Sequence, residues 1–246
     1  MKYIFDAAFL PCEALKEHDV RIVVDLLRAT TQITTFFDMG GEVLIPVTEV
    51  DTAFEMKEKL GEDWKIMGER GGLPAPGFDF GNSPVELQNA GAPDFAIITT
   101  SNGTRALMRA SEGCERVLAG CARNAEAVAW DAICSGKNIG VLCAGRNGEF
   151  SLEDTVCAGM LVEKMLALAP ANGAQEMELT DGAMAAMALW HHFGPDITAL
   201  CQESAHGKIL SALGFDNDLF FCGETDSSST VPVLKKAFGV PALVGR

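Results

Sequence analysis

Short segments rich in valine and isoleucine recur along the chain, and each is followed by a polar turn and then by a longer segment with helical spacing. Most of the short segments are apolar on both faces, which is typical of strands in a sheet that helices cover on each side. We therefore expect an α/β fold with three α/β/α layers and a mostly parallel or mixed sheet. The predicted strands are residues 21–26, 42–47, 65–68, 94–100, 116–119 and 138–144, with a further strand at 3–5.

Local start signals mark two of the intervening helices. Ser83 is followed by a proline and, three residues after the cap, by Glu86, a pattern that satisfies the free N–H groups of a helix N-terminus. Ser151 opens a similar segment, which we expect to extend to about residue 168. Residues 171–182 have few apolar side chains and are predicted to be a linker or an edge loop.

The pattern changes in the last third of the chain. Residues 183–192 and 197–213 are predicted helices, and residues 223–230 form a polar stretch. We expect an α/β domain at residues 1–170 and a helical, loop-rich portion at 171–246 that packs on it, or that is continuous with it.

The charge of the chain limits its partners. It has 246 residues, 19 Lys and Arg against 34 Asp and Glu, and a formal net charge of -15. Such a chain repels nucleic-acid backbones and anionic lipid, so we expect neither as a partner.

Asp6 interrupts the apolar N-terminal run before it reaches signal-peptide length, and the eight cysteines include no C-x-x-C pair. We expect a reduced, cytoplasmic protein and, by base rate, a homodimer.

Polar residues follow the predicted strand at 21–26, where ligands bind in α/β sheets. Asp25, Arg28, Thr30 and Thr31 combine a carboxylate, a cation and two hydroxyls at a helix start, a set that suits a phosphate or sulfonate group. Alternatively, the threonines only cap the helix and Asp25 forms a structural ion pair with Arg28. The residues favour neither interpretation.

A second polar run follows the predicted strand at 94–100. Ser101, Asn102, Thr104 and Arg105 offer hydrogen-bond donors, and Gly103 lets the backbone approach a ligand. A capped helix needs only one such residue, so the run favours an anion site. It is not a Walker sequence, because no G-x-x-x-x-G-K-[ST] motif occurs.

The long glycine-containing connection after residue 68 carries Glu69, Arg70, Asp79, Asn82 and Ser83. Ordered loops of this length in α/β domains are usually functional, although the glycines could also serve only to form turns.

Two acidic residues stand at the start of the helix after the strand at 138–144. Glu153 and Asp154 suit Mg²⁺, which binds hard oxygen ligands, but carboxylates in a first helical turn are also ordinary dipole partners. His206, beside a turn glycine, is a weaker candidate acid or anion contact.

The motifs and their order resemble those of the 2-phosphosulfolactate phosphatase family. They are residues 24–31 (VDLLRATT), 68–70 (GER), 77–84 (GFDFGNSP), 99–104 (TTSNGT) and 143–154 (CAGRNGEFSLED). The resemblance implies a Mg²⁺-dependent acid phosphatase of α/β/α architecture that converts 2-phospho-3-sulfolactate to 3-sulfolactate and phosphate in the route to coenzyme M. Two positions depart from the family pattern: Arg146, where a hydroxyl residue is expected, and Gln32, where a third threonine is common.

The polar residues at the strand ends, together with the family resemblance, indicate a set of site residues. Arg28, Arg70 and Arg105 are predicted to clamp the anion, Asp25 is the first predicted metal ligand, and Asp25 and Asp79 are alternative nucleophiles or bases. A non-catalytic phosphate- or sulfonate-binding module remains the alternative function, followed by a nucleotide-using transferase. The predicted catalytic residues are Asp25, Asp79, Arg28 and Glu69; the predicted metal ligands are Asp25, Glu153 and Asp154; the predicted substrate-binding residues are Thr30, Thr31, Arg70, Asn82, Ser83, Ser101, Asn102, Gly103, Thr104, Arg105 and His206.

Overall fold

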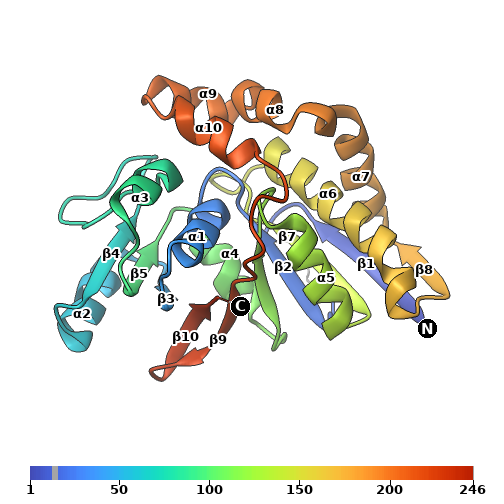
Figure 1. The fold of residues 1–246 in the computed structure, drawn as a ribbon, viewed down its shortest axis with the longest axis horizontal. Coiled ribbons are helices and arrows are strands. Elements are labelled where there is room, and N and C mark those ends of the chain that lie inside the picture. Colours follow the sequence, from blue (N-terminus) through green and yellow to red (C-terminus); the bar gives the residue numbers. More distant parts are fainter. Residues whose placement is uncertain (13–15, 246) are drawn as a thin grey trace.

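The computed structural model describes residues 1–12 and 16–245, and in this part of the chain ten strands form one sheet (Figure 1). Their order in the sheet is β4-β5-β3-β10-β9-β6-β2-β7-β1-β8. The strands are β1 (Lys2–Ala8), β2 (Val20–Val24), β3 (Val43–Pro46), β4 (Trp64–Gly68), β5 (Phe95–Thr99), β6 (Val117–Gly120), β7 (Asn138–Cys143), β8 (Glu176–Leu179), β9 (Val233–Ala237) and β10 (Val240–Val244).

The sheet consists of two parallel wings joined by an antiparallel hairpin. Strands β4, β5 and β3 form the small wing, and β6, β2, β7, β1 and β8 form the large wing. The hairpin β9–β10 pairs with β3 on one side and with β6 on the other, antiparallel in both cases. The sheet is therefore mixed, and the seven strands predicted from the sequence all lie in the two wings.

Helices cover both faces of the sheet, as the α/β/α prediction requires. In Figure 1, α5, α6 and α7 lie beside the large wing, α2 and α3 beside the small wing, and α8, α9 and α10 together at the top of the view. The helices are α1 (Ala29–Asp38), α2 (Val50–Leu60), α3 (Pro84–Ala90), α4 (Gly103–Ala110), α5 (Ala125–Ser135), α6 (Leu152–Leu168), α7 (Asp181–Phe193), α8 (Ile197–Glu203), α9 (Ala205–Ala212) and α10 (Asp216–Gly223), with short 3-10 turns η1 (Ala169–Asn172) and η2 (Gly194–Asp196).

Strand β2 shows why its sequence is apolar on both faces. Ile22 and Val24 are buried in the core that contains residues of α5 and α6, whereas Val23 is buried in a second core. The second core also contains Ile98 of β5 and Leu243 of β10. Side chains alternate between the two faces of a strand, so a strand between two helical layers needs apolar residues throughout. The second core joins the two wings.

The C-terminal third differs from its prediction in two respects. Strand β8 lies in the segment 171–182 predicted as a linker or edge loop, and β9 and β10 follow the polar stretch. The predicted helix at 197–213 is two helices, because Ser204 has an extended backbone and its Oγ accepts the Gly207 N–H, which starts α9. The predicted helix at 183–192 is confirmed as α7.

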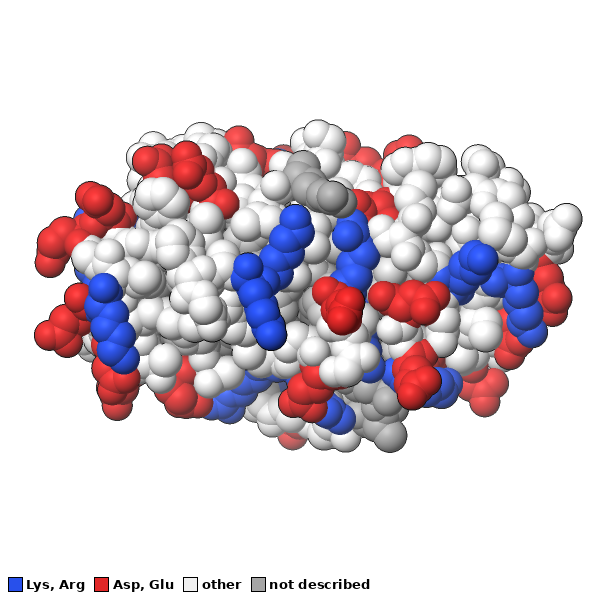
Figure 2. All heavy atoms as spheres, turned by 90° about the horizontal axis from the view of Figure 1, so that it is seen from below, with Lys and Arg blue, Asp and Glu red and all other residues white. Residues whose placement is uncertain are grey.

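The surface carries both signs of charge. Figure 2 shows the face opposite α8, α9 and α10, where lysine and arginine side chains are interspersed with aspartate and glutamate. Within the described residues, no helix combines the length and the apolar character needed to cross a membrane.

Candidate active site

A cavity of about 100 Å³ lies where four strands end. Residues that follow β2, β4, β5 and β7 line it together with the start of α9. The ends of these four strands, each of which the sequence predicts, therefore meet at one cavity. The cavity is lined by Asp25, Leu27, Arg28, Glu69, Gly71, Gly72, Asn82, Ser101, Asn102, Arg146, Asn147, His206, Ile209 and Leu210.

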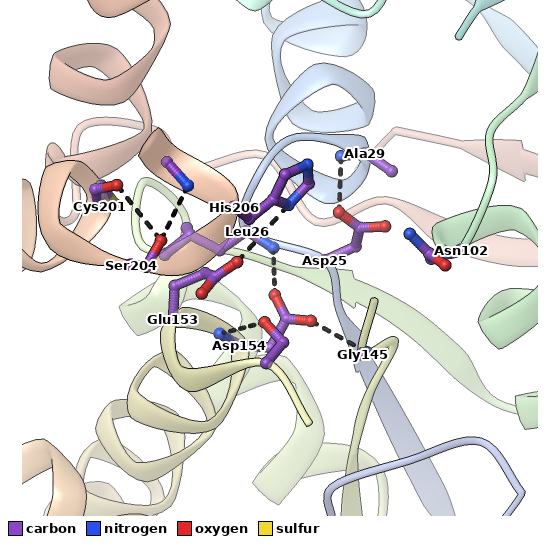
Figure 3. Close-up of polar contacts among 12 residues, drawn as sticks. Asp25, Leu26, Ala29, Asn102, Gly145, Glu153, Asp154, Cys201, Ser204 and His206 are labelled. Carbon is purple, nitrogen blue, oxygen red and sulfur yellow. Dashed lines mark hydrogen bonds and ion pairs between the residues drawn. The ribbon is translucent and has the colours of Figure 1, made fainter. Parts of the chain in front are cut away.

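Asp25 follows β2 directly and is only 6% exposed. Its Oδ1 accepts the Ala29 N–H at 3.2 Å, at the N-terminus of α1, while Figure 3 shows Oδ2 directed toward Asn102. Burial raises the pKa of Asp25 to about 6; the charge of His206 opposes this rise, and the charges of Glu69 and Glu153 add to it. Asp25 is therefore a carboxyl group that changes charge close to neutral pH and has one oxygen available to the cavity.

His206 reaches the cavity from α9 (Figure 3). Its Nδ1 lies 3.6 Å from Oε1 of Glu153, which is almost fully buried in the first turn of α6. Burial alone would raise the pKa of Glu153, but the interaction with His206 lowers it below its ordinary value. Glu153 thus stays ionised and orients the imidazole ring, in the way that a carboxylate orients a catalytic histidine.

Asp154 joins the ends of two strands. Its Oδ1 accepts the Leu26 N–H at 2.9 Å, after β2, and its Oδ2 accepts the Gly145 N–H at 3.1 Å, after β7. Burial, followed by the charges of Asp25 and Glu153, raises its pKa well above the ordinary value. Both oxygens are occupied, and Asp154 does not line the cavity. Its role in the structure is to hold the loops after β2 and β7 beside each other.

Arg28 lines the cavity but is paired within the protein. One guanidinium nitrogen donates to Asp218 Oδ2 at 2.6 Å and the other to the carbonyl of Gly72 at 2.6 Å. The guanidinium also lies 4.1 Å from the ring centre of Phe215. Asp218 in turn accepts hydrogen bonds from Ser83 Oγ and the Val85 N–H. Much of the charge of Arg28 is therefore balanced by Asp218, and the pair connects α1 to α10.

Glu69 organises the loops of the small wing. Its Oε1 accepts the Ser101 N–H at 2.7 Å, and its Oε2 accepts the Gly72 N–H at 2.8 Å. It thereby ties the glycine-containing loop to the loop after β5. On the same side of the cavity, the buried Oδ1 of Asn82 has no hydrogen-bond partner within the described residues. A buried amide oxygen without a partner costs free energy, so this atom is a candidate ligand contact.

Several predicted substrate-binding residues serve instead to start or brace helices. The hydroxyls of Thr30, Thr31 and Thr104 donate to backbone carbonyls five or four residues earlier. Ser83 accepts the Glu86 N–H as the cap of α3. Gly103 does not line the cavity, but it packs so tightly against Asp25 that a β-carbon would lie 2.7 Å from Oδ2. These residues hold the helices and loops that carry the cavity-lining residues.

Three further predicted residues also lie outside the cavity. Asp79 accepts hydrogen bonds from Lys57 and from the Ile66 N–H, both at 2.8 Å, and so braces the edge strand β4. Arg70 and Arg105 line a neighbouring cavity of about 400 Å³, which shares Ser101, Asn102 and Asn147 with the first. Arg70 donates to backbone carbonyls and to Thr99, and Arg105 pairs with Glu49. The predicted clamps are thus divided between two adjoining cavities.

Sequence reasoning missed Asp218 and Asn147. Asp218 lies 190 residues beyond Arg28, in a helix with no start motif that points to function. Asn147 stands in the motif at residues 143–154, in the turn after β7, and its N–H donates to Asn102 Oδ1 at 3.0 Å. A closer reading of that turn could have found Asn147, whereas no local pattern pointed to Asp218.

The cavity combines groups that suit a phosphate ester. Arg28, Arg146, Ser101 and the asparagines offer donors, Asp25 offers a titratable carboxyl group, and His206 is a proton donor or acceptor held by a buried carboxylate. Among residues 1–12 and 16–245, no group of three or more His, Cys, Asp and Glu side chains could hold a metal ion. A metal here would need further oxygen ligands from water or substrate.

Comparisons with known proteins agree over nearly the whole chain. A family model described as 2-phosphosulpholactate phosphatase matches residues 9–237. A protein from Deinococcus radiodurans is 36% identical over 226 residues, which is 91% of both chains. A protein from Pseudothermotoga lettingae is 35% identical over 231 residues, which is 94% of this chain and 95% of the relative. A protein from Thermotoga maritima is 34% identical over 230 residues, which is 93% of this chain and 94% of the relative. Each carries the name "Probable 2-phosphosulfolactate phosphatase".

Proposed function

The chain belongs to the 2-phosphosulpholactate phosphatase family, and from this we propose that it hydrolyses 2-phospho-3-sulfolactate to 3-sulfolactate and phosphate. In the same proposal, the reaction depends on Mg²⁺ and belongs to the route to coenzyme M. The observation that carries the proposal is the convergence of Asp25, His206 and Arg146 on one cavity in a chain of net charge -15. An acidic protein can hold a phosphate ester with two further anionic groups only where cations and N–H donors are concentrated.

The donor set of the cavity fits Mg²⁺. Asp25 Oδ2 and the unpartnered Oδ1 of Asn82 are hard oxygen donors at the cavity wall, and Mg²⁺ is commonly bound by one or two carboxylates together with water and substrate phosphate. We assign Asp25 as the protein carboxylate that holds the ion. Asp154 and Glu153 fit less well, because Asp154 accepts a backbone N–H at each oxygen and Glu153 pairs with His206. When bound, the ion would neutralise charge on the phosphoryl oxygens.

Different side chains of the cavity then have different roles in hydrolysis. The oxygen of a water molecule bonds to the phosphorus, the ester P–O bond breaks, and the leaving alkoxide of sulfolactate takes a proton. One hydrogen of the water stays on the phosphate product, and the other replaces the proton that the alkoxide has taken. We assign His206 as the donor of that proton, since Glu153 holds its Nδ1 side and leaves the rest of the ring toward the cavity. Ser101 and Asn102 lie where they can donate hydrogen bonds to the phosphoryl group.

The test is phosphate release from 2-phosphosulfolactate, phospholactate and phosphoglycolate, each with Mg²⁺ and with EDTA. We expect Mg²⁺-dependent release, fastest from 2-phosphosulfolactate. Asp25→Asn should lower kcat by at least about a hundredfold, the lower range for loss of a group that stabilises the transition state. Asp63→Asn, which removes an exposed carboxylate, is the matched control and should leave kcat unchanged.

The outcomes separate catalysis from binding alone. If no phosphoester is hydrolysed under any condition, the phosphatase proposal is wrong. Calorimetric binding of 2-phosphosulfolactate that survives Asp25→Asn, without hydrolysis by the parent protein, would instead favour a metabolite-binding module.

A further inference from the structure

Two arginines line the cavity, and they differ in how the protein neutralises them. The guanidinium of Arg28 is buried against Asp218, the Gly72 carbonyl and the ring of Phe215. Arg146 is partly buried at the cavity wall, and its side chain has no hydrogen bond or ion pair to any described residue. A cation that lines a cavity without an internal partner has its full charge available for a ligand.

The backbone that carries Arg146 is held firmly. Arg146 and Glu149 exchange N–H···O bonds of 2.9 Å, which close a two-residue turn at Asn147 and Gly148. Both turn residues have positive φ, 53° and 78°, as this kind of tight hairpin turn requires. The Asn147 N–H donates to Asn102, which ties the turn to the loop after β5. The free side chain therefore extends from a fixed position.

The residue before the turn is fixed as well. Gly145 has a φ of 64°, and a β-carbon there would lie 2.7 Å from the carbonyl oxygen of Glu149. Its N–H is held by Asp154. The turn is thus attached to both wings of the sheet, through Asp154 on one side and Asn102 on the other. Such attachment on two sides restricts where the Arg146 guanidinium can lie relative to the cavity.

The charges around the cavity indicate a function for Arg146 in binding an anionic group. Asp25 and Glu69 line the cavity, and Asp218 offsets Arg28 directly behind it. Without Arg146, the cavity would offer a second anionic group of the substrate no arginine that is free of an internal partner, because Arg28 is paired with Asp218, while Asp25 and Glu69 remain at the cavity wall. A substrate with anionic groups in addition to its phosphate would then be repelled.

We propose that Arg146 binds the anionic group or groups on the carbon skeleton of the substrate, a carboxylate or a sulfonate, and so determines specificity for phosphoesters that carry a second anion. This inference rests on the proposed function. Arg146 does not act on the ester bond. Its effect is on substrate affinity, so KM rather than kcat reports it.

The experiment compares steady-state kinetics of the parent protein with Arg146→Gln, which removes the charge, and Arg146→Lys, which keeps it. The control is Lys208→Gln, which removes one positive charge from an exposed position on α9, outside the cavity. Four substrates separate the anions: 2-phosphosulfolactate carries both, phospholactate only the carboxylate, the phosphate ester of 2-hydroxyethanesulfonate only the sulfonate, and p-nitrophenyl phosphate neither.

We expect Arg146→Gln to raise KM roughly 10- to 100-fold for 2-phosphosulfolactate, as for loss of a charge-assisted hydrogen bond, with little change in kcat. The single-anion substrates show which group Arg146 binds. Arg146→Lys should show a smaller rise in KM than Arg146→Gln. Lys208→Gln should leave KM unchanged, and with p-nitrophenyl phosphate Arg146→Gln should have the same KM as the parent protein. An equal rise in KM with p-nitrophenyl phosphate, or no rise with any substrate, would overturn the inference.

A second measurement keeps this inference separate from the proposed function. Calorimetric titration with 3-sulfolactate, which has no phosphate, measures the anion contact without any hydrolysis. Weaker binding by Arg146→Gln than by the parent supports the role of Arg146 even if the parent hydrolyses nothing. Equal affinity of the two proteins, or no binding by either, contradicts it.

Discussion

The buried carboxyl group of Asp25 gives the site its pH dependence and costs the fold stability. Its pKa is raised by burial to about 6, against an ordinary value of 3.8 in an unfolded chain. The folded state therefore holds this proton more tightly than the unfolded state does. The resulting contribution to stability is fully present below about pH 4 and is lost as the pH rises through 6. At neutral pH the ionised group is a burden on the fold.

Replacing this group should accordingly stabilise the metal-free protein. In EDTA at pH 7.5 we expect Asp25→Asn to raise the free energy of unfolding by about 3 kcal/mol, of the order that the shifted pKa implies, and to raise Tm. At pH 4.5 most of the difference should be gone, because the parent carboxyl group is then largely protonated. Thermal unfolding of both proteins from pH 4.5 to 7.5 checks this, with Asp63→Asn as the exposed control. A variant that is less stable than the parent at pH 7.5 would contradict it.

The individual residues show how far sequence reasoning reaches. Asp25, Glu69 and Asn102 could be assigned to one site because each follows a strand, and ligand sites form at strand ends. Asp79 stands in an equally polar motif, but Lys57, 22 residues earlier, holds it against β4. The partner of Arg28 lies in α10 and is brought there only by tertiary packing. Local patterns identify polar residues near a site, whereas pairing across the chain decides which of them remain free for a ligand.

At the scale of elements, the break between α8 and α9 positions His206. The apolar periodicity of residues 197–213 is continuous, so it predicts one helix. The structure interrupts the helix at Ser204, whose Oγ caps α9 by accepting the Gly207 N–H. Gly207 in turn packs against the Cys201 carbonyl. As a result His206 lies in the first turn of α9 and lines the cavity. A side chain in a helix that continued through this position would have a different direction.

This arrangement predicts that two similar caps differ in their effect on activity. Ser204→Ala removes the cap of α9, and Asp196→Ala removes the cap of α8, where Asp196 Oδ1 accepts the Ala199 N–H at 2.8 Å. Each should cost about 1 kcal/mol of stability, the usual effect of a lost cap. Only Ser204→Ala should lower kcat, by about tenfold or more, because it loosens the helix that carries His206. Urea unfolding and phosphate release measure the two effects. Equal kcat in the two variants would show that the cap does not position His206.

At the scale of the whole molecule, the cavity lies at the seam between the two wings. Asp25 and Arg146 follow strands of the large wing, whereas Glu69 and Ser101 follow strands of the small wing. The sequence predicts seven strands of the two wings but neither β8 nor the hairpin that joins the wings. Strand β9 (VLKKA) has two exposed lysines, and β8 (EMEL) is mostly exposed, so neither has the continuous apolar pattern of a buried strand. The relation between the wings depends on contacts between residues far apart in the chain.

The fully buried Leu243 tests whether the seam makes the two wings one cooperative unit. It pairs with Leu44 of β3 and lies in the core that also contains Val23 of β2 and Ile98 of β5. Leu243→Ala should lower the free energy of unfolding by about 2–5 kcal/mol, because the surrounding side chains cannot fill the space that the leucine leaves. The control Lys235→Ala, at an exposed position of β9, should change the free energy of unfolding by less than about 0.5 kcal/mol. Hydrogen exchange followed by mass spectrometry should show β2 and β5 losing protection together in Leu243→Ala, because the shared core links their stabilities. If β5 alone lost protection, the wings would unfold separately, and the geometry of the cavity would then depend on how two independent units meet.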